Sequence, residues 1–180
     1  MPSNVVFERL GLLAELTSKA TLGRTAIMKL LFFLQECKGV PLRYQFSLYS
    51  YGPFDSDVLA DISAAERLNV LKSSVVYYPS GIGYEYSPGA DAKSVENLAQ
   101  DFIHEHKENV EWALNHFARK TAAELEFLST IFFIAKYQNP STVAKLVDQV
   151  EMVKPHFSTD HIRRGFEELV NLGMLRTESN

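Results

Sequence analysis

Cysteine and long apolar runs are scarce in this chain of 180 residues. The one cysteine, Cys37, cannot form a disulfide within a single chain, so a reducing compartment is the simplest expectation. No apolar run reaches the roughly 18–20 residues that a helix needs to cross a bilayer. The N-terminal segment lacks a basic leader and alternates charged residues with leucine, which is not typical of a signal peptide. These absences predict a cytoplasmic protein.

Motifs of the common catalytic and metal sites are also missing. Neither GxGxxG nor GxxxxGKS/T occurs. Ser80-Gly81 is expected in a hairpin turn rather than at a nucleophile elbow, and Cys37 is expected to be buried, which disfavours its thiolate. His104 and His106 are two residues apart and would lie on different helix faces, so they make no ligand pair. We therefore predict no enzymatic activity, no cofactor and no metal site.

Positive charge is in short supply as well. Lysine and arginine number 18 against 22 aspartates and glutamates, for a net charge of −4. A dedicated nucleic-acid-binding domain more often carries a basic face or stripe, so this balance lowers the expectation of DNA binding. The hydrophobic fraction of 46% is enough for a packed core.

The first half of the chain has the pattern of a small α/β unit. Apolar periodicity predicts helices over about residues 4–18 and 24–36. Alternation over residues 44–48 predicts a strand, and Pro53 is expected in the first turn of the next helix. Tyrosine-rich runs on both sides of residues 79–83 predict a β-hairpin. The order of helix, strand, helix and hairpin is typical of a winged helix-turn-helix.

The second half is expected to be helical. Apolar residues over 92–117 predict one long amphipathic connector helix, and Thr121 with Glu124 predicts a capping box at the start of a helix that ends near Tyr137. Two more helices are expected at about 142–152 and 159–172. The predicted fold is mainly α with a small antiparallel β-sheet. It has a winged-helix-like lobe (1–89), the connector (90–120) and a helix-turn-helix-like lobe (121–180).

Two segments carry a family resemblance. Residues 29–33 (KLLFF) and 51–58 (YGPFDSDV) resemble the Panacea domain family of SocA-like antitoxins, and are similar to the related YwgA-like proteins. The resemblance covers mainly residues 24–86, and it departs from the Panacea pattern at Leu48-Tyr49-Ser50. It implies a small protein that binds and neutralises a toxin or acts as an adaptor for a protease. It implies no catalytic residue.

Tyrosines and acids around the predicted sheet form the candidate binding surface. Tyrosine joins a large apolar body to a polar tip and is enriched at protein interfaces. The alternative is that the tyrosines stiffen the sheet through cross-strand pairs. The candidate partner-binding residues are Tyr49, Tyr51, Gly52, Pro53, Asp55, Asp57 and Asp61.

DNA binding through the second lobe is the competing hypothesis. The helix before the hairpin is acidic and would repel phosphates, whereas a basic cluster surrounds the turn between the last two helices. The candidate DNA-binding residues are Lys154, His161, Arg163 and Arg164. The leading expectation is a non-enzymatic protein-interaction module that binds a protein partner, possibly a toxin. Nucleic acid is the less favoured partner, and a homodimer through the connector helix is open in either case.

Overall fold

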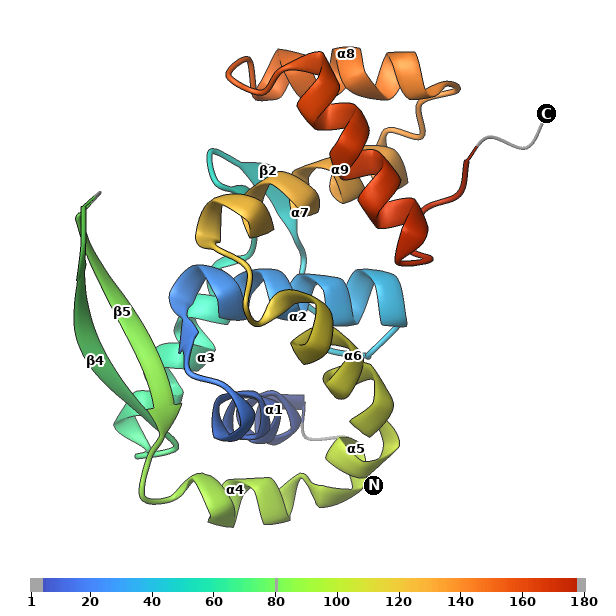
Figure 1. Ribbon diagram of the computed structural model, residues 1–180. Coiled ribbons are helices and arrows are strands. Elements are labelled where there is room, and N and C mark those ends of the chain that lie inside the picture. Colours follow the sequence, from blue (N-terminus) through green and yellow to red (C-terminus); the bar gives the residue numbers. More distant parts are fainter. Residues whose placement is uncertain (1–4, 80, 178–180) are drawn as a thin grey trace.

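The computed structural model describes residues 5–79 and 81–177 and is mainly helical with a small antiparallel sheet, as predicted (Figure 1). The expected positions Asn4 and Ser80 lie outside the described residues. The helices are α1 (Val5–Lys19), α2 (Arg24–Lys38), α3 (Ser56–Arg67), α4 (Ala92–Leu98), α5 (Gln100–Glu105), α6 (Lys107–Phe117), α7 (Ala122–Tyr137), α8 (Val143–Val153) and α9 (Thr159–Asn171). The strands are β1 (Leu22–Gly23), β2 (Ser47–Tyr49), β3 (Gly52–Phe54), β4 (Leu71–Tyr78) and β5 (Gly81–Pro88).

The first lobe has the strand arrangement of a winged helix. Its sheet has the order β1-β5-β4, with α3 directly before the β4–β5 hairpin. The hairpin is longer than the sequence predicted, and its register runs without interruption from Leu71 opposite Pro88 to Tyr78 opposite Gly81. We call β4 and β5 together the β-ribbon. β2 and β3 form a separate two-stranded hairpin between α2 and α3, which we call the tyrosine hairpin.

The predicted strand over residues 44–48 is wrong for most of its length. Only Ser47–Tyr49 is a strand, and the chain before it runs along α2 without a strand partner. The amide side chain of Gln35 replaces that partner, because it accepts a hydrogen bond from the Tyr44 N–H (2.8 Å) and donates one to the Tyr44 carbonyl (2.9 Å). Both backbone groups of Tyr44 are thereby satisfied outside a sheet.

The predicted position of Pro53 is also wrong. Pro53 lies in β3 rather than in the first turn of a helix, and α3 begins at Ser56. Asp55 is the N-cap of α3, and its carboxylate accepts a hydrogen bond from the Asp57 N–H at 2.8 Å. An aspartate cap satisfies a free N–H at the helix start and so fixes the boundary two residues after the proline.

The connector is three short helices rather than one long one. α4, α5 and α6 are interrupted at Ala99 and His106, each with φ −104° and ψ 13°. The bends wrap the segment around α1, which contacts all three helices (Figure 1). The two backbones come close at Gly11 of α1, where an added Cβ would lie 2.4 Å from the Cβ of Ala99. The bends let this longer segment stay in contact with the 15-residue α1.

α7 contacts α2 and β3 of the first lobe and α8 and α9 near the C-terminus. Its N-terminus has the predicted capping box between Thr121 and Glu124. Phe132 of α7 packs edge-on against Phe32 and Phe33 of α2, with ring centroids 5.9 Å and 6.0 Å apart, and Phe33 stacks on Phe117 of α6 at 4.4 Å. A single cluster of buried side chains runs from Leu10 in α1 to Leu169 in α9. The three predicted segments therefore share one hydrophobic core.

Two smaller features complete the fold. Trp112 on α6 lies beneath the C-terminal end of α2, where the Lys38 ammonium is 4.0 Å from its ring centroid. None of the helices in the described residues is long and apolar enough to span a membrane.

Candidate functional site

A buried lysine fixes the tyrosine hairpin to α2. Lys29 is 2% exposed, and its ammonium donates a hydrogen bond of 2.6 Å to the carbonyl of Pro53. Burial lowers the pKa of Lys29 to about 8, with Glu126 opposing that shift and Lys154 adding to it. The two segments that carry the family resemblance thus meet in space, since Lys29 belongs to one and Pro53 to the other.

A second buried lysine holds the other side of the same hairpin. Lys154, which follows α8, is 4% exposed, donates to the Ser50 carbonyl and forms an ion pair with Glu126 of α7. An ammonium with three donors can satisfy a carboxylate and a carbonyl together. The predicted role of Lys154 as a phosphate contact is therefore wrong, because its charge is neutralised inside the protein.

Gly52 brings the hairpin close to α7. Its φ is +82°, which is a left-handed conformation that favours glycine. A Cβ there would meet the hydroxyl oxygens of Ser129 and Thr130, both at 3.1 Å. Gly52 and Pro53 are buried, so these two predicted partner-binding residues anchor the hairpin and do not reach a partner.

Two of the three predicted acidic binding residues are internal as well. Asp55 accepts hydrogen bonds from the backbone N–H groups of Gln45 and Asp57. Asp61 accepts one from the Tyr44 hydroxyl at 2.8 Å and pairs with Arg9 at 3.4 Å. Burial raises the pKa of Asp61, although Tyr44 and Arg9 oppose that shift. Of the three predicted acidic binding residues, Asp57 is the exposed one.

Tyr49 at the end of β2 and Tyr51 in the turn that follows do face solvent. Tyr49 is 61% exposed and Tyr51 is 76% exposed. The Tyr49 ring is 5.3 Å from that of Phe54, so the base of the turn is aromatic on its inner side. The structure thus places Tyr49 and Tyr51 together at the end of an element whose backbone is held by two buried ammonium groups.

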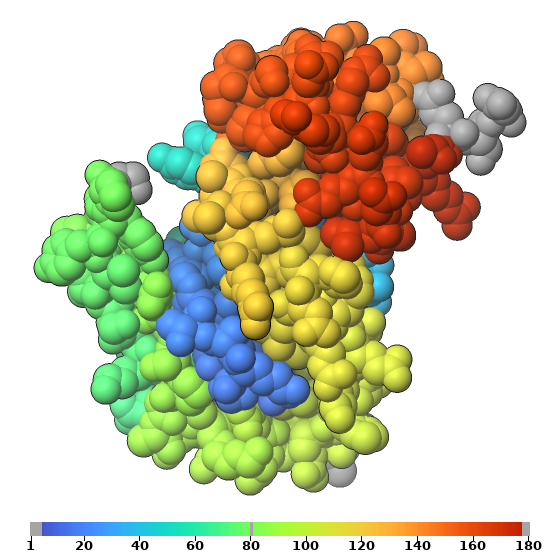
Figure 2. Space-filling view, in the orientation of Figure 1, coloured from blue at the N-terminus to red at the C-terminus, as the bar shows by residue number. Residues whose placement is uncertain are grey.

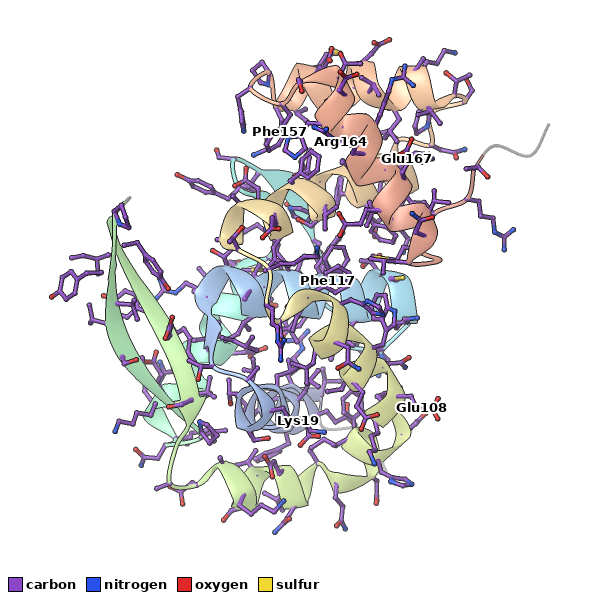
Figure 3. All side chains as sticks on the ribbon, viewed as in Figure 1. Lys19, Glu108, Phe117, Phe157, Arg164 and Glu167 are labelled. Atoms are coloured by element: carbon purple, nitrogen blue, oxygen red, sulfur yellow. The ribbon has the colours of Figure 1, made fainter. Side chains whose placement is uncertain are left out.

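The candidate DNA-binding residues do not form one surface with Lys154. Arg163 and Arg164 are exposed on α9. Figure 3 labels Arg164 on this helix. His161 stacks on Phe127 of α7, with ring centroids 4.1 Å apart and planes 26° apart. His161 is nevertheless exposed, so the three candidates on α9 lie at the surface and Lys154 is the buried one.

Sequence reasoning missed Glu126, Arg9 and the structural roles of both lysines. A signal exists for the lysines: Lys29 lies within the apolar run of residues 27–34, and Lys154 follows the apolar end of α8. A lone cation in an apolar run indicates a buried donor with a specific acceptor, because an unpaired buried charge is too costly to keep.

Other possible chemistry is limited. No group of three or more His, Cys, Asp or Glu side chains among the described residues is placed to hold a metal ion. Cys37 is half-buried rather than buried as predicted, and burial raises the pKa of its thiol. A hollow of about 650 Å³ lies between β5, the start of α2 and the start of α7.

No protein-family model matches the chain, and no curated protein matches it either.

Proposed function

We propose that this protein is a non-enzymatic protein-interaction module, antitoxin- or adaptor-like, that binds a protein partner through Tyr49 and Tyr51. The observation that carries the proposal is the pair of buried lysines, Lys29 and Lys154, which fix the backbone of the tyrosine hairpin from two sides. Both tyrosines stay exposed at the end of this fixed element.

Pre-organisation explains why such an anchor suits binding. A side chain that is already held in its bound position loses little entropy when a partner arrives, so more of the contact energy remains as affinity. Tyrosine is among the residues that carry most of the binding energy at protein interfaces. Asp57, exposed at the start of α3, adds a negative charge next to the hairpin and favours a partner with a basic rim.

Truncation of Tyr51 tests the proposal. The wild-type protein is used to capture its partner from a lysate of the source organism, and the partner is identified and purified. Tyr51→Ala is expected to weaken the partner's affinity by roughly 30-fold, the effect of losing about 2 kcal/mol at a hot spot. Calorimetric titration with the purified partner measures this, and a thermal melt checks that the variant stays folded.

Leu98→Ala is the matched control, since Leu98 is 70% exposed but lies on α4. It is expected to leave the affinity unchanged. Equal affinity for wild type and for a Tyr49→Ala/Tyr51→Ala double variant would contradict the proposal. A mobility-shift assay tests the competing use of α9: retardation of DNA that is lost in Arg163→Ala/Arg164→Ala would favour a DNA-binding regulator instead.

A further inference from the structure

The outer half of the β-ribbon projects beyond the core. At its base, Leu71 and Tyr86 are buried on the side that faces α1. Towards its tip the same side of the ribbon is largely exposed, with the Arg24 guanidinium 4.9 Å from the centroid of the Tyr84 ring. Figure 2 shows the outer part of the ribbon standing away from the body of the molecule. Four apolar side chains lie on this outer part, each between 41% and 79% exposed: Val75, Tyr77, Ile82 and Tyr84.

The free edge of β4 follows from the hairpin's register. At the base of the ribbon the Gly89 N–H donates to the Val70 carbonyl at 2.8 Å, and bonded and non-bonded pairs alternate from there along the register. Leu71 opposite Pro88 then falls at a non-bonded pair, which agrees with the missing N–H of proline. Every second residue of β4, including Ser73, Val75 and Tyr77, therefore directs its N–H and C=O away from β5.

This edge lacks the usual protection against pairing. Among the described strands, β4 is the end of the order β1-β5-β4 and has β5 as its one neighbour. It is eight residues long, contains no proline, and carries one charge, at Lys72. Natural edge strands of this length are commonly blocked by prolines, bulges or several charges, because a bare edge pairs with another strand.

We propose that β4 pairs antiparallel with β4 of a second copy of this chain across a two-fold axis at Val75. A two-fold axis perpendicular to the sheet keeps equivalent faces on the same side, so residues whose numbers sum to 150 lie opposite each other. Val75 then faces its own equivalent and Ser73 faces Tyr77, and all three direct their backbone groups to that edge. The result is one continuous sheet of both copies, in the order β1-β5-β4-β4-β5-β1.

Charge complementarity favours a second copy over other occupants. Lys72 and Glu85 are the two charged residues of the β-ribbon, so the ribbon is neutral and offers no attraction for nucleic acid. In the proposed register Lys72 lies opposite Tyr78 of the second copy, at a closely spaced, non-bonded pair. The Tyr78 hydroxyl donates to Glu85 at 3.1 Å. Each lysine is thus brought over a tyrosine ring and towards a carboxylate of the other copy.

The same register joins the uncovered apolar residues. The side of the ribbon with Val75 and Tyr77 meets the equivalent side of the second copy, so two apolar strips become one across the axis. On the opposite side of the ribbon, the Tyr78 ring packs over Gly83, where an added Cβ would be 2.6 Å from the ring. This contact holds the Tyr78 side chain in place next to the edge. An isologous contact of this kind closes on itself and gives a dimer, not a fibre.

Cross-linking at the axis tests the register. Val75→Cys is made in a Cys37→Ser background, so that the introduced thiol is the one cysteine of the chain. Opposed residues at a bonded pair have Cα atoms about 5.5 Å apart, within reach of a short bis-maleimide linker. We expect a covalent dimer of twice the 20.3 kDa chain mass. Glu108→Cys, exposed on α6 far from the ribbon, is the matched control and is expected to stay monomeric under the same conditions (Figure 3).

Sedimentation over a concentration series tests the dimer without a linker. The wild type is expected to shift to twice the chain mass as concentration rises. Val75→Lys places two like charges at the axis and is expected to weaken self-association at least tenfold with an unchanged melting temperature of the monomer. A wild type that stays monomeric at all concentrations overturns the proposal. So does a dimer that persists in Val75→Lys, or cross-linking of Glu108→Cys equal to that of Val75→Cys.

Discussion

Lys29 is a cationic residue buried inside the protein. Its ammonium lies in an apolar stretch of α2 and donates to one carbonyl, that of Pro53. Burial disfavours the charged form, and the pKa of Lys29 is accordingly lowered from 10.5 to about 8. At neutral pH the folded protein keeps the charge, and the hydrogen bond to Pro53 with it.

This lowered pKa predicts a pH dependence of stability. Between pH 8 and 10.5 the unfolded chain still binds a proton at Lys29 while the folded protein has lost it, so this group makes folding more favourable as pH rises through that window. The change approaches about 3 kcal/mol, from 1.36 kcal/mol per pKa unit. Lys29→Met keeps a side chain of similar length and has no proton to lose.

The measurement is urea unfolding of wild type and Lys29→Met at several pH values from 7 upward. The free energy of unfolding of the wild type is expected to rise relative to that of Lys29→Met through this window. Taking the difference removes the titration of tyrosines and other lysines, which both proteins share. A difference that is flat or falls with pH would show that Lys29 is not held in an environment that disfavours its charge.

The burial of individual charged residues could not be predicted from the sequence. A sequence gives the number of carboxylates on a helix but not which of them turn inward, and Asp55 and Asp61 turn inward because Gln45, Tyr44 and Arg9 offer donors there. Tyr49 and Tyr51, two residues of the predicted binding surface, are exposed in the structure. The prediction for Lys154 is wrong for the same reason as that for Asp61, because its partner Glu126 is 28 residues away in the chain.

The tyrosine hairpin is held in place by contacts from α2, α7 and the residue that follows α8. Lys154 and Glu126 form the outer pair of this clamp, and their side chains are 6% and 17% exposed. Lys154→Met leaves the Glu126 carboxylate without its cation in a poorly hydrated site. We expect a loss of about 3 kcal/mol in the free energy of unfolding, near the lower end for a broken buried pair because Glu126 keeps some contact with water.

A double-mutant cycle separates the pair from its surroundings. Adding Glu126→Gln to Lys154→Met is expected to cost clearly less than the sum of the two single changes, with a coupling of about 1–3 kcal/mol by denaturant unfolding. The exposed pair Lys107 and Glu111, 3.9 Å apart, serves as the reference, with a coupling below about 0.5 kcal/mol. Strict additivity at Lys154 and Glu126 would rule out the clamp as a coupled pair.

Elements with local signals could be predicted well. The β-ribbon, the capping box at Thr121 and the helices α8 and α9 each follow from residues that are close in sequence. The segment before β2 and the bends at Ala99 and His106 depend on distant partners, namely the Gln35 side chain and the surface of α1. Periodicity alone cannot distinguish one long amphipathic helix from three that keep the same face against another helix.

The whole molecule is built around one continuous hydrophobic core. Residues from α1, α2, α6, α7 and α9 belong to a single buried cluster, in which phenylalanines of α2 and α7 pack against each other. We expect one cooperative thermal transition, with equal calorimetric and van't Hoff enthalpies. Two resolved transitions in scanning calorimetry would show instead that residues 121–180 unfold independently.

The packing of Trp112 has a practical consequence for studies of this protein. It is the one tryptophan of the chain, and its ring is held between the Lys38 ammonium and the aromatic rings of His116 and Phe117. Its fluorescence therefore comes from a single place, the junction of α2 and α6. Emission intensity and wavelength serve as a label-free optical probe of that junction, in a protein that needs no added dye.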